Sequence, residues 1–320
     1  MNFPYKIADE LVPVLEQFNS RPRPAPGTPL QDVFRAQMLA SAQRNKIQSD
    51  SVVRVRDEYV IDTNGQEIQL RVYSPEVSAG ARPCLYWMHG GGTISGLPEQ
   101  NDPAMHDIVQ SVNCVVISVN YRLAPEHPYP VPLNDCFEGL KYIANNAEKF
   151  SIDPKRIAVG GSSAGGLLAT SCAMMARNMG KPNIVHQSLA YPMLDNRNET
   201  DSSKQILNIG VWDRDMNIFA WQAYLRDVTG DIPDLAVPAL AKDLSGLAPA
   251  FLAVGTMDVM RDETIEYAQK LVAAGVRTEL HLYPGMVHVF DSLVPHSEAS
   301  IDFISARIDA LKRAFSKNAI

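Results

Sequence analysis

This sequence is poor in cysteine and lacks the motifs that mark metal and nucleotide sites. Only four of its 320 residues are cysteine, and they lie in apolar stretches without C-x-x-C spacing: Cys84, Cys114, Cys136 and Cys172. Reduced thiols in the core are therefore expected rather than disulfides or a zinc site. No H-E-x-x-H, Walker or dinucleotide fingerprint occurs. We expect no cofactor and no metal ion.

The chain also lacks basic clusters and long apolar runs. Its net charge is −7, and no group of Lys and Arg could follow a phosphate backbone, so nucleic acid is excluded as a partner. No run approaches the roughly 18 apolar residues of a membrane span. The first residues, Met1 to Lys6, do not show the basic-then-apolar pattern of a signal peptide. A cytoplasmic location is the expectation.

The most informative motif is a G-x-S-x-G pentapeptide, residues 161–165, at the junction of a strand and a helix. The strand pattern Arg156–Val159 precedes it, and a helical pattern begins near Ala164. Such a turn exposes the central serine, Ser163, as a nucleophile, and the flanking glycines allow the chain to close. The pentapeptide occurs by chance in roughly one chain of this length in ten. The interpretation therefore depends on the other parts of a hydrolase site.

A glycine triplet supplies the second part. His89-Gly90-Gly91-Gly92 directly follows the apolar run Cys84–Met88. Successive glycines let the main chain approach a substrate carbonyl, and their N–H groups can bind the negative charge that develops on its oxygen. The amide of Ala164, at a helix N-terminus, would be a third donor. A flexible surface turn is the alternative reading of the triplet.

A base and an acid follow the serine in the order expected of an α/β-hydrolase. Of the seven histidines, only His288 stands after Ser163 on a loop beyond a strand, Thr278–Tyr283; His89 fits a loop anchor better. The preceding strand, Ala250–Val254, leads into Asp258, so acid and base can meet at one edge of the sheet. Asp262 is the rival acid, although its position predicts an N-cap of the following helix.

Together these residues resemble the hormone-sensitive-lipase-like esterases, bacterial family IV, from about residue 55 to the end. The motifs that carry the resemblance are His89 to Gly92, Tyr121 to Pro130, the Ser163 elbow with Gly166, Tyr191-Pro192, Asp258 to Glu263, and His288-Val289-Phe290. The resemblance implies a carboxylesterase with Ser163 as nucleophile, His288 as base and Asp258 as acid. It likewise implies an oxyanion hole of the Gly90, Gly91 and Ala164 amides.

Three positions depart from the pattern of that family. Ser162 stands where many members have Asp, Asn120 where Asp often precedes the Tyr-Arg pair, and Thr93 where a bulky residue often follows the triplet. None of them removes a catalytic group, but they leave substrate preference open. Related enzymes are often dimers, so the resemblance also suggests a homodimer. The last apolar strand and the C-terminal helix are the elements that could pair with a second copy.

The fold class expected is α/β, with a mostly parallel sheet and helices on both faces, because strand and helix patterns alternate after residue 50. Strands are predicted at Val52–Val60, Gln66–Tyr73, Pro83–Met88, Cys114–Asn120, Arg156–Gly160, Val185–Ala190, Ala250–Val254 and Thr278–Tyr283. Helices are predicted at Gln31–Arg44, Asp102–Val112, Leu133–Glu148, Ala164–Asn178, Asp262–Ala274 and Ser297–Lys312. Residues 51–194 and 236–320 would then form the α/β-hydrolase domain.

Two regions outside the alternation are predicted to form a helical cap: residues 1–50, with a Pro-rich stretch at Arg21–Pro29, and the insertion 195–235. Aromatic residues concentrate in the insertion at Trp212, Phe219, Trp221 and Tyr224. They attach the cap to the body or, for one or two of them, line a substrate pocket. We name Trp212, Phe219 and Tyr191 as candidate substrate-binding residues.

A small pocket under such a cap favours esters of short to medium acyl chains. Two other classes of function stay open at this point. The same triad serves an amidase, a deacetylase or a lactonase. A non-catalytic receptor on the same fold would bind a small molecule and hydrolyse nothing, although such receptors tend to lose a member of the triad.

Overall fold

An eight-stranded sheet lies at the centre of the computed structural model, which describes residues 6–20, 28–48, 50, 52–62, 65–77, 80–207, 209 and 211–316. The strands are β1 (Val53–Ile61), β2 (Glu67–Pro75), β3 (Arg82–Met88), β4 (Val115–Asn120), β5 (Ile152–Ser162), β6 (Ile184–Ala190), β7 (Ala250–Gly255) and β8 (Thr278–Tyr283). Their order is β1-β2-β4-β3-β5-β6-β7-β8. β2 is antiparallel to both of its neighbours, and the other pairs are parallel.

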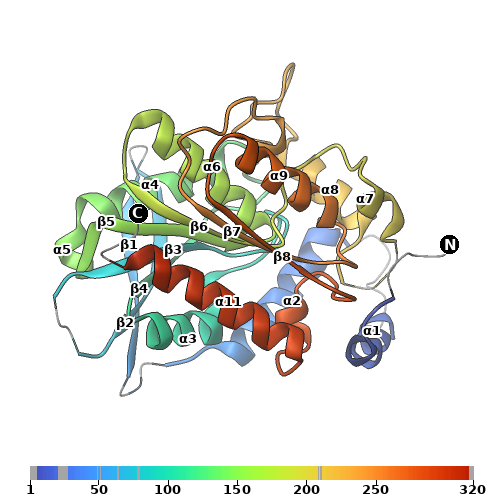
Figure 1. Ribbon diagram of the computed structural model, residues 1–320, viewed down its shortest axis with the longest axis horizontal. Helices are drawn as coiled ribbons and strands as arrows, with labels where there is room; N and C mark the ends of the chain where they lie inside the picture. The colour runs from blue at the N-terminus through green and yellow to red at the C-terminus, as the bar shows by residue number, and fades with distance from the viewer. Residues whose placement is uncertain are drawn as a thin grey trace.

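Helices cover both faces of this sheet (Figure 1). The α-helices are α1 (Val12–Asn19), α2 (Leu30–Asn45), α3 (Asp102–Val112), α4 (Val131–Asn145), α5 (Ala147–Phe150), α6 (Ala164–Met179), α7 (Asp201–Gln205), α8 (Arg214–Tyr224), α9 (Arg261–Ala273), α10 (Phe290–Leu293) and α11 (Glu298–Phe315). Short 3-10 helices are η1 (Asp9–Leu11), η2 (Pro98–Asn101) and η3 (Pro238–Leu240). One face carries α3 and α11, and the other carries α4, α6 and α9.

The core lies on both sides of the sheet because parallel strands covered by helices bury both of their faces. In β3, Leu85 and Trp87 pack into one cluster with residues of α3 and α11, whereas Cys84, Tyr86 and Met88 pack into the cluster under the opposite helices. The α/β-hydrolase fold with a mostly parallel sheet is thus confirmed. All four cysteines are buried free thiols.

The elements differ from the sequence prediction mainly at their ends. The helix predicted at Leu133–Glu148 is divided into α4 and α5, because Asn146 adopts φ −117° and ψ 35° and ends the first helix. β5 begins at Ile152, four residues before its predicted start, and α1 and α10 are not predicted at all. Most of the Pro-rich stretch, residues 21–27, lies outside the described residues, as do residues 1–5.

The two regions predicted as a cap meet at the end of the sheet toward which the parallel strands point. Figure 1 shows α2, α7 and α8 gathered there. The Phe34 ring of α2 lies 6.0 Å from the ring of Trp212, just before α8. In the part of the chain that the structure describes, no helix combines the length and the apolar character needed to cross a membrane.

Candidate active site

The turn between β5 and α6 places Ser163 at the carboxyl edge of the sheet. Ser163 has φ 57° and ψ −121°, a conformation that a non-glycine residue adopts only where its surroundings enforce it. Its N–H donates to Ala190 O at 2.9 Å, and its carbonyl accepts from Met193 N at 3.0 Å. Gly165 permits the close packing of α6 on β3, because a Cβ atom there would overlap the carbonyl oxygen of Met88.

Ser163, His288 and Asp258 are joined by hydrogen bonds although they lie far apart in the sequence. His288 Nε2 is 2.9 Å from Ser163 Oγ, and His288 Nδ1 is 2.8 Å from Asp258 Oδ2. Asp258 follows β7 and His288 follows β8, so the register of these two neighbouring strands brings their loops together. Asp258 is 0% exposed, and Ser163 and His288 are each 3% exposed. Nδ1–H donates to the carboxylate, which leaves Nε2 free to accept the serine proton.

Asp262, the rival acid, points elsewhere. Its Oδ2 accepts from Ser202 N at 2.6 Å, and its own N–H donates to Ser202 Oγ at 3.1 Å, so it links α9 to α7. The prediction that Asp262 caps the following helix is wrong: Met260 is the N-cap, with no side-chain cap bond. Asp258 Oδ1 instead accepts from Met260 N at 2.9 Å, which fixes the carboxylate against the helix start.

The glycine triplet and the start of α6 present three N–H groups beside Ser163. No loop or turn hydrogen bond among the described residues is donated by the N–H of Gly90, Gly91 or Ala164. The carbonyl preceding each of these groups is already bonded. His89 O accepts from Tyr121 at 2.7 Å, Gly90 O accepts from Gln100, and Ser163 O accepts from the first turn of α6.

In a trans peptide the C=O and N–H point in opposite directions. Each bonded carbonyl therefore fixes the direction of the N–H that follows it. Gly90 lies directly beside the serine, because a Cβ atom at this position would be 3.4 Å from Ser163 Cβ. Gly91 has φ +127°, a backbone conformation that residues with a side chain rarely adopt.

His89 occupies the anchoring role expected of it. Its ring is fully buried and stacks on Tyr121 with ring centroids 4.2 Å apart, and its Nδ1 lies 3.0 Å from Gly90 O. Burial lowers the pKa of His89 to about 4. The ring is therefore neutral at neutral pH, where Nδ1–H can donate to the Gly90 carbonyl.

The sequence alone predicts no role for Glu263, whose carboxyl lies near the site. Glu263 is buried in α9, and its Oε1 accepts from Leu194 N at 2.7 Å and from Asp195 N at 3.3 Å. Burial, with the negative charges of Asp195 and Asp258, raises the pKa of Glu263 well above its usual range. The sequence signal for it is the position of a glutamate at the end of the motif Asp258 to Glu263, on the face of α9 that Tyr267 and Leu271 bury.

Of the three candidate substrate-binding residues, Trp212 lies against the glycine loop. A Cβ atom at Gly92 would be 2.5 Å from Trp212 Cη2, and the Trp212 ring centroid is 6.1 Å from that of His288. The Tyr191 ring contacts His288 edge-on at 4.8 Å, but its hydroxyl is turned to Asp291 Oδ1 at 2.7 Å. Phe219 is half-buried against the main hydrophobic cluster.

The three departures from the family pattern occupy different positions. Asn120 Nδ2 donates to Gln69 Oε1 at 2.9 Å on the neighbouring strand, away from the triad. Ser162 lies against Gly90. Thr93 is fully buried at φ +62°, and its hydroxyl has no hydrogen-bond partner among the described residues.

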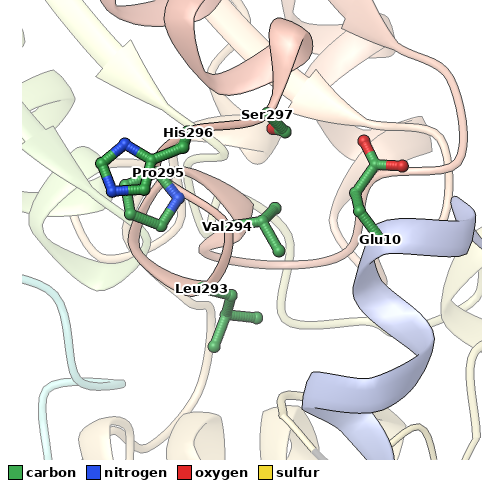
Figure 2. Close-up of a pocket in the computed structure, with 6 residues that line it drawn as sticks. All are labelled: Glu10, Leu293, Val294, Pro295, His296 and Ser297. Carbon is green, nitrogen blue, oxygen red and sulfur yellow. The ribbon is translucent and has the colours of Figure 1, made fainter.

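Two surface cavities lie apart from this constellation. One, of about 410 Å³, lies between Glu10 and the loop 293–297, and Figure 2 shows the Glu10 side chain facing that loop. The other, of about 590 Å³, is lined by residues of 196–198 and one face of α8. Neither lining includes a triad residue. Across the described residues, no group of His, Cys, Asp or Glu is arranged to hold a metal ion.

The sheet order and the loops at its carboxyl edge define the class of α/β-hydrolases. A family model described as alpha/beta hydrolase fold matches residues 85–292, more than half of the chain. The chain belongs to this family, and its resemblance to the hormone-sensitive-lipase-like group is confirmed. The expected class of enzyme, a carboxylic ester hydrolase, is also confirmed.

Known proteins resemble the chain over most of its length. It is 36% identical over 252 residues to carboxylesterase NlhH of Mycobacterium tuberculosis, covering 78% of this chain and 79% of that protein. It is 31% identical over 255 residues to an arylesterase of Saccharolobus solfataricus, covering 79% and 81%. The solved structure of a bacterial heroin esterase has a TM-score of 0.88 at 34% identity, covering 98% of this chain and 99% of that one.

Proposed function

We propose that this carboxylesterase hydrolyses esters of short to medium acyl chains through a covalent acyl-enzyme on Ser163. The observation that carries the proposal is the continuous buried chain of hydrogen bonds from Ser163 Oγ through His288 to Asp258. A nucleophile, a base and an orienting acid in hydrogen-bond contact are the requirement for nucleophilic acyl transfer.

In the first half-reaction, Ser163 Oγ attacks the ester carbonyl while His288 Nε2 takes the serine proton. The N–H groups of Gly90, Gly91 and Ala164 bind the oxygen that becomes negative. His288 then gives its proton to the departing alcohol as the C–O bond of the ester breaks. In the second half-reaction, His288 takes a proton from water, which attacks the acyl-enzyme, and Ser163 regains its proton as the carboxylic acid leaves.

Residues 1–50 and 195–235 act in this proposal as a cap that limits the acyl chain. The support is the position of Trp212, which lies over Gly92 and packs against Phe34 of α2. An extended acyl chain needs an apolar groove, and the Trp212 ring occupies the space beside the oxyanion loop. Activity on p-nitrophenyl esters should peak below C12, and a maximum at C12 or longer would contradict the chain-length assignment.

An ester rather than an amide or lactone substrate is proposed because the relatives above are named as esterases. Parallel assays of matched p-nitrophenyl esters, p-nitroanilides and lactones separate these substrates. The cytoplasmic location and the homodimer stay predictions of the sequence.

The test of the mechanism is Ser163→Ala. We expect kcat to fall by about 10⁶-fold, as in other enzymes whose catalytic serine is removed, with an unchanged melting temperature. Ser171→Ala is the matched control, because Ser171 lies in α6, the helix that follows Ser163, and its hydroxyl donates to Leu167 O within that helix. A fluorophosphonate should label residue 163 in the parent and in Ser171→Ala. Turnover close to that of the parent in Ser163→Ala would overturn the proposal.

A further inference from the structure

The Gly90–Gly91 peptide has no side chain of its own to fix its orientation. Rotation of this peptide unit changes only ψ of Gly90 and φ of Gly91, and glycine resists neither change sterically. A reversed peptide would turn the Gly91 N–H away from Ser163 and place a carbonyl oxygen where an oxyanion must bind. The hole proposed above therefore requires a contact that holds the Gly90 carbonyl in place.

Gln100 of η2 makes that contact with both ends of its side-chain amide. Nε2 donates to Gly90 O at 3.2 Å, and Oε1 accepts from Leu97 N at 3.2 Å. One end meets an acceptor and the other meets a donor, so only a neutral amide in this orientation satisfies both. A carboxylate of the same shape would keep the bond to Leu97 and set an oxygen against the Gly90 carbonyl.

The segment that carries Gln100 is itself firmly anchored. Its backbone carbonyl accepts from Asn45 Nδ2 at 3.2 Å, which connects η2 to the end of α2. Two residues further on, Asp102 is fully buried and binds Arg71 through two hydrogen bonds of 2.9 and 2.8 Å. The side-chain amide is thus presented to the glycine loop from a fixed support.

We propose that Gln100 is a positioning residue of the oxyanion hole, which holds the Gly90–Gly91 peptide in the orientation that directs the Gly91 N–H toward the reacting carbonyl. The inference rests on the function proposed above. His89 Nδ1 also lies near Gly90 O, at 3.0 Å. Because this second contact persists without Gln100, the loss should be smaller than that of a whole oxyanion donor.

The test compares Gln100→Glu and Gln100→Met with the parent. The first keeps the bond to Leu97 and replaces the donor to Gly90 by an acceptor. The second keeps the length and removes both bonds. Gln66→Glu is the matched control, because Gln66 is exposed on the loop before β2 and undergoes the same change of charge. Each variant is assayed for kcat, KM, melting temperature and inhibition by a trifluoromethyl ketone, whose tetrahedral adduct places an oxyanion in the hole.

For Gln100→Glu we expect kcat to fall about 10- to 100-fold, below the 10²- to 10³-fold cost of losing a donor outright. KM should change less than about twofold, and the inhibition constant of the ketone should rise in step with the loss of kcat/KM. Gln100→Met should show a smaller loss in the same direction. Gln66→Glu should match the parent.

Two outcomes would overturn the inference. In one, Gln100→Glu, or Gln100→Met if the first fails to fold, turns over within twofold of the parent. In the other, kcat falls while the affinity for the ketone is unchanged, which would indicate a structural role only. Ser163→Ala, assayed alongside, distinguishes these two outcomes from a failure of the proposed esterase function. An active Ser163→Ala overturns the esterase mechanism, whereas an inactive one beside an active Gln100→Glu overturns only the role of Gln100.

Discussion

The loops at the edge of the sheet and the described parts of the two segments 1–50 and 195–235 differ in how much their attachment to the body depends on particular side chains. The loops are fixed largely by their own backbone. Thr256 N donates to Tyr283 O at 2.9 Å, and Met257 N donates to Met286 O at 2.9 Å, which bind the Asp258 loop to the His288 loop. Ser163 is fixed in the same way against β6.

The two segments, where the structure describes them, make a few backbone bonds to the body, such as Ala8 N to Gly285 O at 3.0 Å and Tyr129 N to Tyr224 O at 2.7 Å, but two arginines also attach them through side chains alone. Arg35 of α2 donates to Ile94 O at 2.9 Å, to Ala124 O at 3.0 Å and to both carboxylate oxygens of Glu126. Arg226, just beyond α8, donates to Pro125 O at 2.6 Å. These contacts are partly exposed, so water and salt compete with them.

The difference indicates that the catalytic geometry of the loops and the access of substrate under the cap can be changed independently. Backbone bonds do not depend on side-chain identity, so the geometry of the triad should survive substitutions in the cap. Contacts made by one arginine depend entirely on that residue, so the cap can be loosened by a single change. Substitutions in the two parts test this division, from the largest expected effect to the smallest.

The largest difference is expected between two neighbouring aspartates, Asp258 and Asp262. Asp258→Asn keeps the shape of the side chain but removes the charge that orients His288, and we expect kcat to fall by about 10⁴-fold. Asp262→Asn retains an acceptor for Ser202 N on the link to α7, and kcat should fall less than about tenfold. Steady-state kinetics on one short-chain ester measure both.

Equal losses in the two variants would remove Asp258 from its proposed role and make the linkage between α9 and α7 the decisive feature. Circular dichroism of both variants is the control, because a loss of fold in Asp258→Asn would make its kinetics uninformative. In that case Asp258→Glu, which keeps the charge, replaces it.

A change of access without a change of chemistry is expected from Arg35→Leu. The side chains of Arg35 and Glu126 are 30% and 52% exposed, so after solvent screening the contact contributes about 1 kcal/mol. That energy corresponds to about a fivefold change in an equilibrium. We expect KM to rise by about that factor and kcat to stay within twofold, measured on a short-chain ester.

Arg35→Lys is the matched variant for that experiment. It keeps the charge but not the planar group that reaches several acceptors, so its KM should fall between those of the parent and of Arg35→Leu. A hundredfold loss of kcat in either variant would show that the cap and the triad are not separable.

The sequence predicted the sheet and the triad because both leave local signals. All eight strands were predicted, the central ones such as β3 and β7 as continuous apolar runs because helices cover both of their faces, and β8 at the sheet edge from its alternation of polar and apolar residues. The elbow at Ser163 and the glycines at 90–92 are local motifs. Asp258 and His288 follow consecutive strands, and their meeting depends only on those strands being neighbours.

What the sequence did not predict depends on contacts between distant segments. The bond of Gln100 to Gly90 and the three contacts of Arg35 need the tertiary fold before they exist. Asp262 was misassigned as a helix cap because a local pattern competed with a tertiary bond to Ser202, some sixty residues away. Propensity cannot decide such a competition.

The smallest expected effect concerns stability alone and arises from the buried carboxyl of Glu263. Its pKa is raised in the folded protein, so the folded state holds a proton that the unfolded chain releases at a lower pH. Stability from this group is therefore fully present below the unfolded pKa and is lost as pH rises through the folded pKa. Glu263→Gln has no such proton to lose.

The melting temperature of Glu263→Gln, relative to the parent, should accordingly rise by a few degrees between pH 5 and pH 9. Asp302→Asn is the control, because Asp302 is exposed and its carboxylate accepts from the Tyr283 hydroxyl at 3.0 Å. Its difference from the parent should not grow with pH. A constant difference for Glu263→Gln would mean that the carboxyl is ionised throughout this range, stabilised by the N–H groups of Leu194 and Asp195. The negative charge of Glu263 beside Asp258 would then be present in the working enzyme. The loops at the edge of the sheet would in that case be shaped by this charge as well as by their backbone bonds.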